Sequence, residues 1–350
     1  MENSEIQMPW YKKLLNYVAS TTNGMAIGLF GTLIIGTIIN QFATIPHMEA
    51  IKDFATVIKG LMGAGIGLGV ALSLKKQGVT VVAATAAGMI GNYAFSFATG
   101  KVSSIGDPLS CYISAVICLQ MIDLIMRKKT PVDLILIPLV GLIFSMIYAT
   151  LLSNYIHYVT VGIGELIKIA FDFIPFIMCI VVSVLMGMAL TAPISSVAIA
   201  ITISIGNVPL AAGAALLGCC TQMVGFAVQT SRDNKWGSVL AVGIGTSMLQ
   251  FKNIVKKPII WLPTIISSAI LGPFAMLFDF ATDSVGAGMG TSGLVGILNT
   301  LNVMGYDYLI VIEVLSFTLI VPAVLVFLID FGFRKLHWIE KGDLSLSSEI

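Results

Sequence analysis

The chain has 350 residues, of which 57% are hydrophobic and only 11% are charged. Soluble globular proteins carry about 25% charged residues, and a formal net charge of +1 gives no field of either sign, so composition excludes most soluble enzymes, disordered chains and nucleic-acid binders. A mean hydropathy of +0.96 and apolar runs of about 20 residues along the whole length indicate a polytopic membrane protein.

Ten apolar runs are predicted to be transmembrane helices. They lie at about 24–45, 54–74, 79–99, 107–126, 132–152, 173–190, 208–230, 236–251, 258–280 and 308–333. The eighth run is the shortest. The predicted fold class is an all-α polytopic membrane protein with about ten transmembrane helices, two re-entrant hairpins and an interfacial amphipathic helix.

Basic residues gather at alternate ends of these spans. Most of the 19 Lys and Arg residues fall on the side of the N terminus. Lys59 and Lys168 lie in segments of ambiguous position. The residues on the opposite side are Lys52, Lys101, Arg232 and Lys235. Because cytoplasmic loops are rich in Lys and Arg, the asymmetry predicts that both termini are cytoplasmic.

Three stretches do not fit a simple transmembrane helix. Residues 154–172 mix apolar and charged residues, which is typical of an interfacial amphipathic helix. Residues 191–207 are apolar, short and rich in Ser and Thr, and residues 283–300 are rich in Gly. Short apolar segments interrupted by Gly or Pro are typical of binding sites in transporters. We therefore expect a re-entrant hairpin near each, the first entering from the cytoplasmic side and the second from outside.

The pattern G-x-G-T-S-x-L occurs twice, at 243–249 and 288–294. Backbone unwound at the glycines would expose N–H and C=O groups, which membrane depth tolerates only within protein or beside a water-filled cavity. Hydroxyl side chains both donate and accept hydrogen bonds, and therefore suit a sugar. The residues concerned are Thr246, Ser247, Thr291 and Ser292. Helix packing through Gly-Thr-Ser explains the pattern equally well.

Further polar residues near membrane depth complete the predicted lining of a solute site. They are Thr191, Ser195, Ser196, Gln222 and Gln250, with Asn207 and Asn253 as outer candidates. Pro193 favours a turn or helix start, which places its neighbouring hydroxyls either near a hairpin tip or in a helix cap. Unpaired amides are costly in hydrocarbon, so the glutamines face a cavity or join helices to one another.

Few groups in the sequence could carry catalysis or ion coupling. Glu313 lies within the last span without a basic neighbour, so it is a candidate for ion coupling. Asp123 has Arg127 four residues later, which predicts a local ion pair. The 5 cysteines lie in apolar segments without CxxC spacing, and the 3 histidines lack metal-ligand spacing. We therefore predict no catalytic residue, no metal site and no cofactor.

Four stretches resemble the EIIC-like membrane proteins of the bacterial phosphotransferase system. They are TAPISSVAIA (191–200), GAALLGCCTQMVGFAVQ (213–229), GIGTSMLQFKNIVKKP (243–258) and GAGMGTSGLVG (286–296). The resemblance extends over nearly the whole chain, and the most similar branch includes the perfringolysin regulator of clostridia. Members of this branch have been described both as transport subunits and as regulators.

The resemblance implies a division of the chain into four parts in a bacterial inner membrane. These are a scaffold half that mediates homodimerisation (1–153), an amphipathic linker helix (154–172), a transport half with both hairpins (173–333) and a cytoplasmic tail (334–350). Phosphorylation coupled to transport would require separate soluble IIA and IIB partners. Better-known sugar members of the family place a Glu and a His near the sugar. In this sequence the Gly-rich hairpin lacks Glu, and the C-terminal half has no His except His337 in the tail.

The reading that follows is a homodimeric IIC-type transporter of a sugar-like polar solute, which works by alternating access and has no catalytic residues of its own. Ser, Thr, Asn, Gln and backbone groups would bind the solute. A membrane sensor that regulates gene expression and an ion-coupled carrier are the alternatives.

Overall fold

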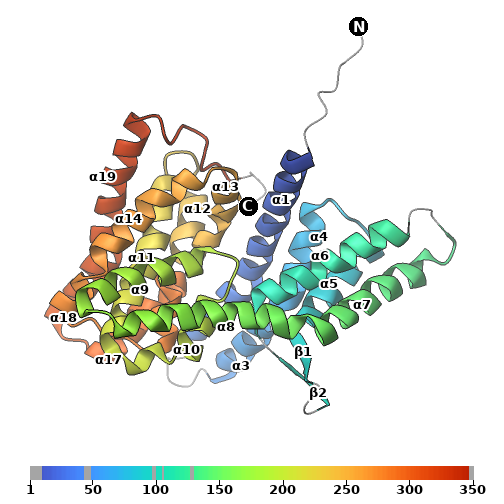
Figure 1. The fold of residues 1–350 in the computed structure, drawn as a ribbon, viewed down its shortest axis with the longest axis horizontal. Coiled ribbons are helices and arrows are strands. Elements are labelled where there is room, and N and C mark those ends of the chain that lie inside the picture. Colours follow the sequence, from blue (N-terminus) through green and yellow to red (C-terminus); the bar gives the residue numbers. More distant parts are fainter. Residues whose placement is uncertain (1–9, 43–48, 97–99, 105, 127–129, 347–350) are drawn as a thin grey trace, which may run out of the picture.

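The computed structural model describes residues 10–42, 49–96, 100–104, 106–126 and 130–346, and nearly all of its regular structure is helical (Figure 1). In Figure 1 the N-terminal half lies on the right and the C-terminal half on the left, with the first helix between them. We call the end of the molecule where this helix begins the upper end, and the opposite end the lower end.

The helices of the N-terminal half are α1 (Trp10–Leu29), α2 (Ile35–Phe42), α3 (Glu49–Gly60), α4 (Met62–Ser73), α5 (Val79–Gly91), α6 (Pro108–Ile125) and α7 (Asp133–Leu151). A π-helical turn, Phe30–Ile34, joins α1 to α2. The first helix begins at Trp10, before the predicted span 24–45, because the polar residues that precede the apolar run are also helical. α3 and α4 meet at a bend of 46°.

A β-hairpin follows α5, and its first strand lies within the predicted span 79–99. β1 (Tyr93–Ser96) pairs antiparallel with β2 (Lys101–Ser104), and Tyr93 lies opposite Ser104. Aromatic and β-branched residues favour strands, and Gly100 has a positive φ of 65°. The third span therefore ends at Gly91 rather than near 99, and the prediction of an all-α fold was wrong in this segment.

The remaining elements are α8 (Ser153–Ile169), α9 (Pro175–Thr191), α10 (Ser196–Thr202), α11 (Pro209–Thr230), α12 (Trp236–Leu240), α13 (Phe251–Lys256), α14 (Leu262–Leu271), α15 (Phe274–Leu277), α16 (Ser284–Met289), α17 (Val295–Met304), α18 (Tyr308–Leu315) and α19 (Val321–Lys335). α8 runs across both halves in Figure 1 and corresponds to the predicted linker helix. α14 and α19 pack on α11, which is almost wholly buried.

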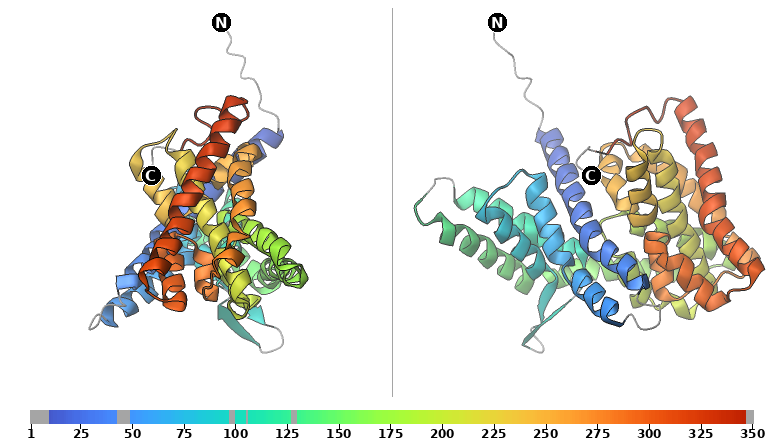
Figure 2. Two further views of the ribbon diagram at one scale, coloured as in Figure 1. Left: turned by 90° about the vertical axis from the view of Figure 1, so that its left-hand side faces the viewer. Right: turned by 180° about the vertical axis from the view of Figure 1, so that it is seen from behind.

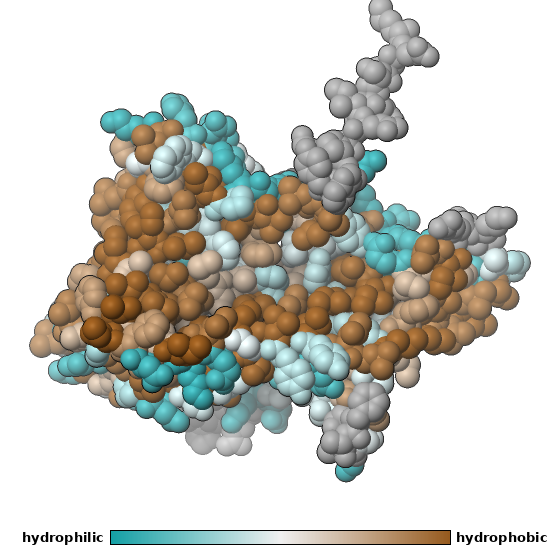
Figure 3. Space-filling model, viewed as in Figure 1, coloured by the Kyte–Doolittle hydropathy of each residue, from teal (hydrophilic) through white to brown (hydrophobic). Residues whose placement is uncertain are grey.

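The helices are those of a membrane protein in length and composition. Within the described residues six helices are long and apolar enough to cross a membrane, and the bent pair α3–α4 makes a seventh. On the face shown in Figure 3, hydrophobic side chains cover the middle of the molecule, whereas hydrophilic side chains gather toward its upper and lower ends. This distribution matches a bilayer around the middle of the molecule.

α9 and α10 form a helical hairpin that we call hairpin A. α9 runs parallel to α11, because a Cβ on Gly218 would lie 1.9 Å from the Ser183 carbonyl oxygen, and Thr191 reaches Gln222 further along both helices. The chain then returns along α10. The predicted span 173–190 is therefore one leg of a hairpin that opens at the lower end, not a complete crossing.

A second hairpin, hairpin B, comprises residues 236–256. Its first leg descends beside α11, where a Cβ on Gly243 would lie 3.0 Å from the Ala227 Cβ. Its second leg returns upward, because Gln250 bonds Thr230 at the end of α11. The predicted eighth span, 236–251, was wrong for this reason: an apolar run of that length fits half a hairpin as well as a short crossing.

α16 and α17 form hairpin C, which also opens at the lower end. Gly206 donates its N–H to Ser284 at 3.2 Å, and Ser196 bonds Gly288, so α10 runs antiparallel to α16. Hairpins A and C therefore enter from one end, and hairpin B enters from the other. The expectation that hairpins A and C enter from opposite sides was wrong.

The path of hairpins A and B changes the side of the loop 231–235. Arg232 Nε lies 3.5 Å from Asp330 Oδ2 of α19, so this loop shares the upper end with the C-terminal basic residues. The predicted topology treated α9 and hairpin B as membrane crossings, and it therefore placed the segment between them on the wrong side of the membrane. The correction moves Arg232 and Lys235 to the basic side and strengthens the charge asymmetry.

The revised path predicts which positions an impermeant thiol reagent reaches from one face of a membrane. Lys235→Cys and Lys341→Cys should be labelled from the same side, and Lys101→Cys from the other, because all three residues are exposed at the ends stated above. The native cysteines are all buried and should give little background. Labelling of Lys235→Cys together with Lys101→Cys in intact cells would contradict this path.

Candidate functional site

The tips of the three hairpins meet inside the C-terminal half. Thr191 at the tip of hairpin A and Ser247 at the tip of hairpin B have hydroxyl oxygens 2.8 Å apart. The tip of hairpin C joins hairpin B through Thr291 and Ser292. All four side chains are buried. The structure therefore brings together residues that the sequence separates by as much as a hundred positions.

The two G-x-G-T-S copies bond directly to each other. The Thr291 hydroxyl donates to the Gly243 carbonyl oxygen at 2.6 Å, and the Ser292 hydroxyl donates to the Gly245 carbonyl oxygen at 2.8 Å. A π-helical turn at Ala241–Gly245 leaves these carbonyls outside regular helix bonding. The hydroxyls of the second copy therefore satisfy backbone acceptors of the first, which unwound backbone at membrane depth requires.

Glycine at the tips permits close contact with the N-terminal half. A Cβ on Gly245 would lie 2.0 Å from the Phe30 ring, within the π-helical turn between α1 and α2. Gly293 has a φ of 56°, and a Cβ there would lie 3.0 Å from Ile38. We call α1, the π-helical turn and α2 together the α1–α2 rod (residues 10–42). The tips of hairpins B and C thus contact the α1–α2 rod.

Gln222 of α11 lies beside this junction and is fully buried. Its Oε1 accepts hydrogen bonds from Trp261 Nε1 at 3.0 Å and from the Thr264 hydroxyl at 2.9 Å, with the Thr191 hydroxyl at 3.4 Å. Its Nε2 is buried without a partner among the described groups. One carbonyl oxygen therefore joins α11, hairpin A and the segment before α14.

The remaining predicted lining residues occupy different places. The Ser195 hydroxyl caps α10 by accepting from Ala198 N at 3.1 Å, and Ser196 donates to the Gly288 carbonyl oxygen at 2.7 Å. Thr246 accepts from Met248 N at 3.2 Å and so caps the turn at the tip of hairpin B. Asn207 is exposed at the lower end, apart from the other predicted residues.

Gln250 and Asn253 hold the C-terminal tail against hairpin B. Gln250 Nε2 donates to the Thr230 hydroxyl at 2.7 Å and to the Leu344 carbonyl oxygen at 3.0 Å. Asn253 Nδ2 donates to Gln250 Oε1 at 2.7 Å and to the Ser345 carbonyl oxygen at 3.1 Å. Their amides are therefore engaged at the upper end, away from the hairpin tips.

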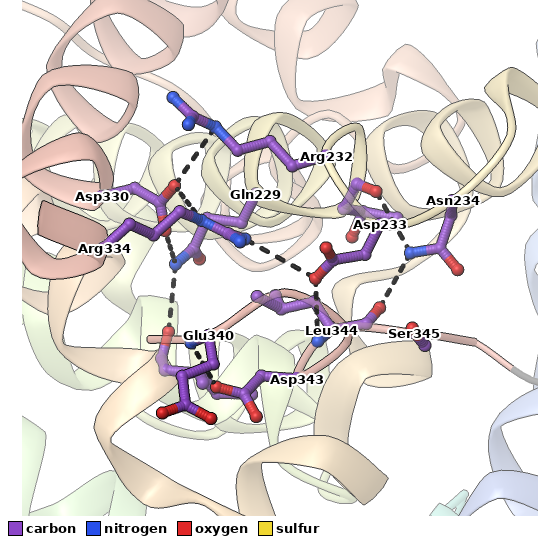
Figure 4. Close-up of polar contacts among 12 residues, drawn as sticks. Gln229, Arg232, Asp233, Asn234, Asp330, Arg334, Glu340, Asp343, Leu344 and Ser345 are labelled. Carbon is purple, nitrogen blue, oxygen red and sulfur yellow. Dashed lines mark hydrogen bonds and ion pairs between the residues drawn. The ribbon is translucent and has the colours of Figure 1, made fainter. Parts of the chain in front are cut away.

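A charged network closes the same end (Figure 4). Asp330 is fully buried and accepts from Arg334 Nε at 2.8 Å and from Gln229 Nε2 at 3.1 Å. Arg334 also lies 3.6 Å from Asp233, which accepts from Leu344 N at 3.2 Å. Buried charges need such partners, so the network ties α11, α19 and the tail together.

A cavity of about 540 Å³ lies between the two halves and is lined partly by polar residues. Asn40, Asn92 and Asn302 stand near the lower ends of their segments, so the cavity belongs to the lower part of the molecule. The lining residues are Leu33, Thr37, Asn40, Lys59, Met62, Asn92, Gly106, Ser195, Val197, Val285, Met289, Val295, Asn299 and Asn302. Ser195 is the member of the predicted site that lines it.

The sequence contained a signal for this lining that was missed. Asn299 and Asn302 are three residues apart, which places both on one face of α17. Asn40 and Asn92 each end an apolar run. All the predicted lining residues lie in the C-terminal half, so the prediction left out the N-terminal wall of the cavity.

Glu313 and Asp123 do not contribute to the cavity lining. Glu313 is half-buried on α18, and its side chain makes no hydrogen bond or ion pair within the part of the chain that the structure describes. Asp123 accepts from Lys76 Nζ at 2.7 Å. The predicted partner Arg127 lies outside the described residues, and Lys76, which follows the end of α4, pairs with Asp123.

The contacts of Gln222 predict that removing its amide destabilises the protein. In Gln222→Leu the half-buried Trp261 N–H loses its acceptor, and leaving a buried polar group unsatisfied costs about 1–3 kcal/mol. The melting temperature of the detergent-purified variant should fall clearly below that of the wild type. Gln77→Leu, in an exposed loop, is the matched control and should melt as the wild type does. Equal melting of both variants would contradict the role of Gln222.

Comparisons with known proteins place these features in a family. The family model described as "Phosphotransferase system, EIIC" matches residues 19–346. A search of curated proteins finds no match. The matched range contains all three hairpins and every residue that lines the cavity. The chain therefore belongs to the phosphotransferase system EIIC family.

Proposed function

We propose that this chain moves a small, sugar-like polar solute across the bacterial inner membrane by alternating access. Membership of the EIIC family supports a transporter of the phosphotransferase type in general. The observation that supports a sugar-like solute and alternating access is the cavity between the halves. Its volume of about 540 Å³ falls in the range of small-molecule sites, about 300–1,000 Å³, and its amides and hydroxyls suit a solute with many hydroxyls.

In this proposal the solute binds between the α1–α2 rod on one side and hairpins A and C on the other. Ser195 and Asn299 would contact it from the C-terminal half, and Asn40 from the N-terminal half. The buried hydroxyls at the hairpin tips would form the closed upper end of the site. They are the predicted residues Thr191, Thr246, Ser247, Thr291 and Ser292.

The lower end is the outer side in this proposal, and both termini are cytoplasmic. The cavity belongs to the lower part, whereas the upper part is sealed. Met248 and Leu344 pack with Met25 and Leu29 of α1 in one buried apolar cluster. The conformation would therefore be outward-facing, and transport would require this cluster to open while the cavity closes.

Phosphorylation of the solute, where it occurs, would be carried out by separate soluble IIA and IIB proteins. All five cysteines of this chain are buried, which suits packing rather than phosphoryl transfer. We also propose that the protein works as a homodimer through its N-terminal half. Exposed apolar residues such as Leu134 and Leu139 on α7 provide a surface for lipid or a second copy.

Replacing a lining amide by an apolar group should weaken solute binding without unfolding the protein. Asn302→Leu replaces a lining amide by a branched apolar group, so binding of a sugar-class solute should weaken by at least about tenfold, which corresponds to about 1.4 kcal/mol. Asn207→Leu is the matched control, because Asn207 is exposed and does not line the cavity. The measurement is ligand-dependent melting of purified protein, followed by uptake into proteoliposomes. Equal loss in both variants would contradict the site.

A further inference from the structure

We propose that the solute of the cavity is an anion with several hydroxyl groups, and that the Lys59 ammonium is its counter-charge. This inference rests on the proposed function, because it concerns the solute of the same cavity. The chemistry is that of a sugar or polyol carrying a carboxylate or a phosphate.

The first observation is the position of Lys59. It lies in the last turn of α3, directly before the bend to α4, and it lines the cavity while being half-buried. Its aliphatic stem packs on Gly36, where a Cβ would lie 2.8 Å from Lys59 Cγ. Any larger residue at 36 would displace the stem, so the α2 surface is shaped to hold this side chain.

The second observation is the charge of the lining. Among the described residues that line the cavity, Lys59 is the one charged residue, and none of them is Asp or Glu. No ion pair of Lys59 is recorded among the described side chains. A half-buried charge without a partner is costly, and its attraction to an anion is stronger at such a place than in water. The cavity therefore favours a solute that supplies the negative charge.

The third observation is the orientation of two amides. Asn302 Oδ1 already accepts from the Tyr306 hydroxyl at 2.6 Å, which leaves the Asn302 N–H groups to donate. Asn299 Nδ2 donates to Asp283 at 3.0 Å, which leaves its carbonyl oxygen to accept. Donors suit a carboxylate or phosphate, and an acceptor suits hydroxyl groups. The lining thus offers both functions beside a cation.

The test compares neutral and anionic members of matched pairs on the purified full-length protein. The pairs are glucose with glucuronate, glucitol with gluconate, and glucose with glucose 6-phosphate, and the readouts are calorimetric affinity and ligand-dependent melting. We expect the anionic member of at least one pair to bind about tenfold or more tightly, and less tightly at high salt. The carboxylate and phosphate arms distinguish the two kinds of anion.

Variants assign the preference to Lys59. Lys59→Gln should remove the preference for the anion, whereas Lys59→Arg should keep it. Lys52→Gln is the matched control, because Lys52 lies exposed on the same helix and does not line the cavity, and it should leave affinity unchanged. If Lys59→Gln does not fold, the wild-type pairs and Lys59→Arg still decide the matter.

Two results would overturn the inference and leave the proposed function standing. One is tighter binding of the neutral member in every pair, and the other is an unchanged preference in a folded Lys59→Gln variant. Failure of the wild type to bind any member of the panel would instead overturn the proposed function, and this inference with it.

Discussion

The structure depends on one constraint: backbone groups at membrane depth must find hydrogen-bond partners within the protein. Three hairpins end inside the C-terminal half, and their tips leave regular helix geometry. Thr291 and Ser292 satisfy the carbonyls of hairpin B, and Thr191 joins Ser247. Gln222 connects this junction to the long buried helix α11. Each tip therefore depends on the other tips for hydrogen-bond partners.

The same junction relates the two halves to each other. Gly245 and Gly293 bring hairpins B and C against Phe30 and Ile38 of the α1–α2 rod. The cavity lies below these contacts, and an apolar cluster with a polar tail lies above them. In the proposed function a solute in this cavity would lie between the two halves, with closed contacts on one side only, as alternating access requires.

Much of the architecture could be predicted from the sequence, because apolar runs and Lys or Arg positions report directly on the bilayer. The Gly-Thr-Ser repeat also identified segments that meet. Hairpin B could not be recognised, since an apolar run such as 236–251 does not reveal whether the chain crosses or turns back at Gly245. The cavity wall at Asn40 and Asn92 was missed because pairing between halves depends on tertiary contacts that no local pattern encodes.

Under the proposed function the hairpin tips must move relative to the α1–α2 rod during transport. Ile38→Cys and Gly293→Cys place two thiols at a contact where a Cβ on Gly293 would lie 3.6 Å from the Ile38 Cα, close enough for a disulfide. The measurement is uptake of the bound solute into proteoliposomes before oxidation, after oxidation and after reduction. We expect oxidation to stop uptake while solute binding persists, and reduction to restore uptake. Undiminished uptake with the disulfide fully formed would contradict it.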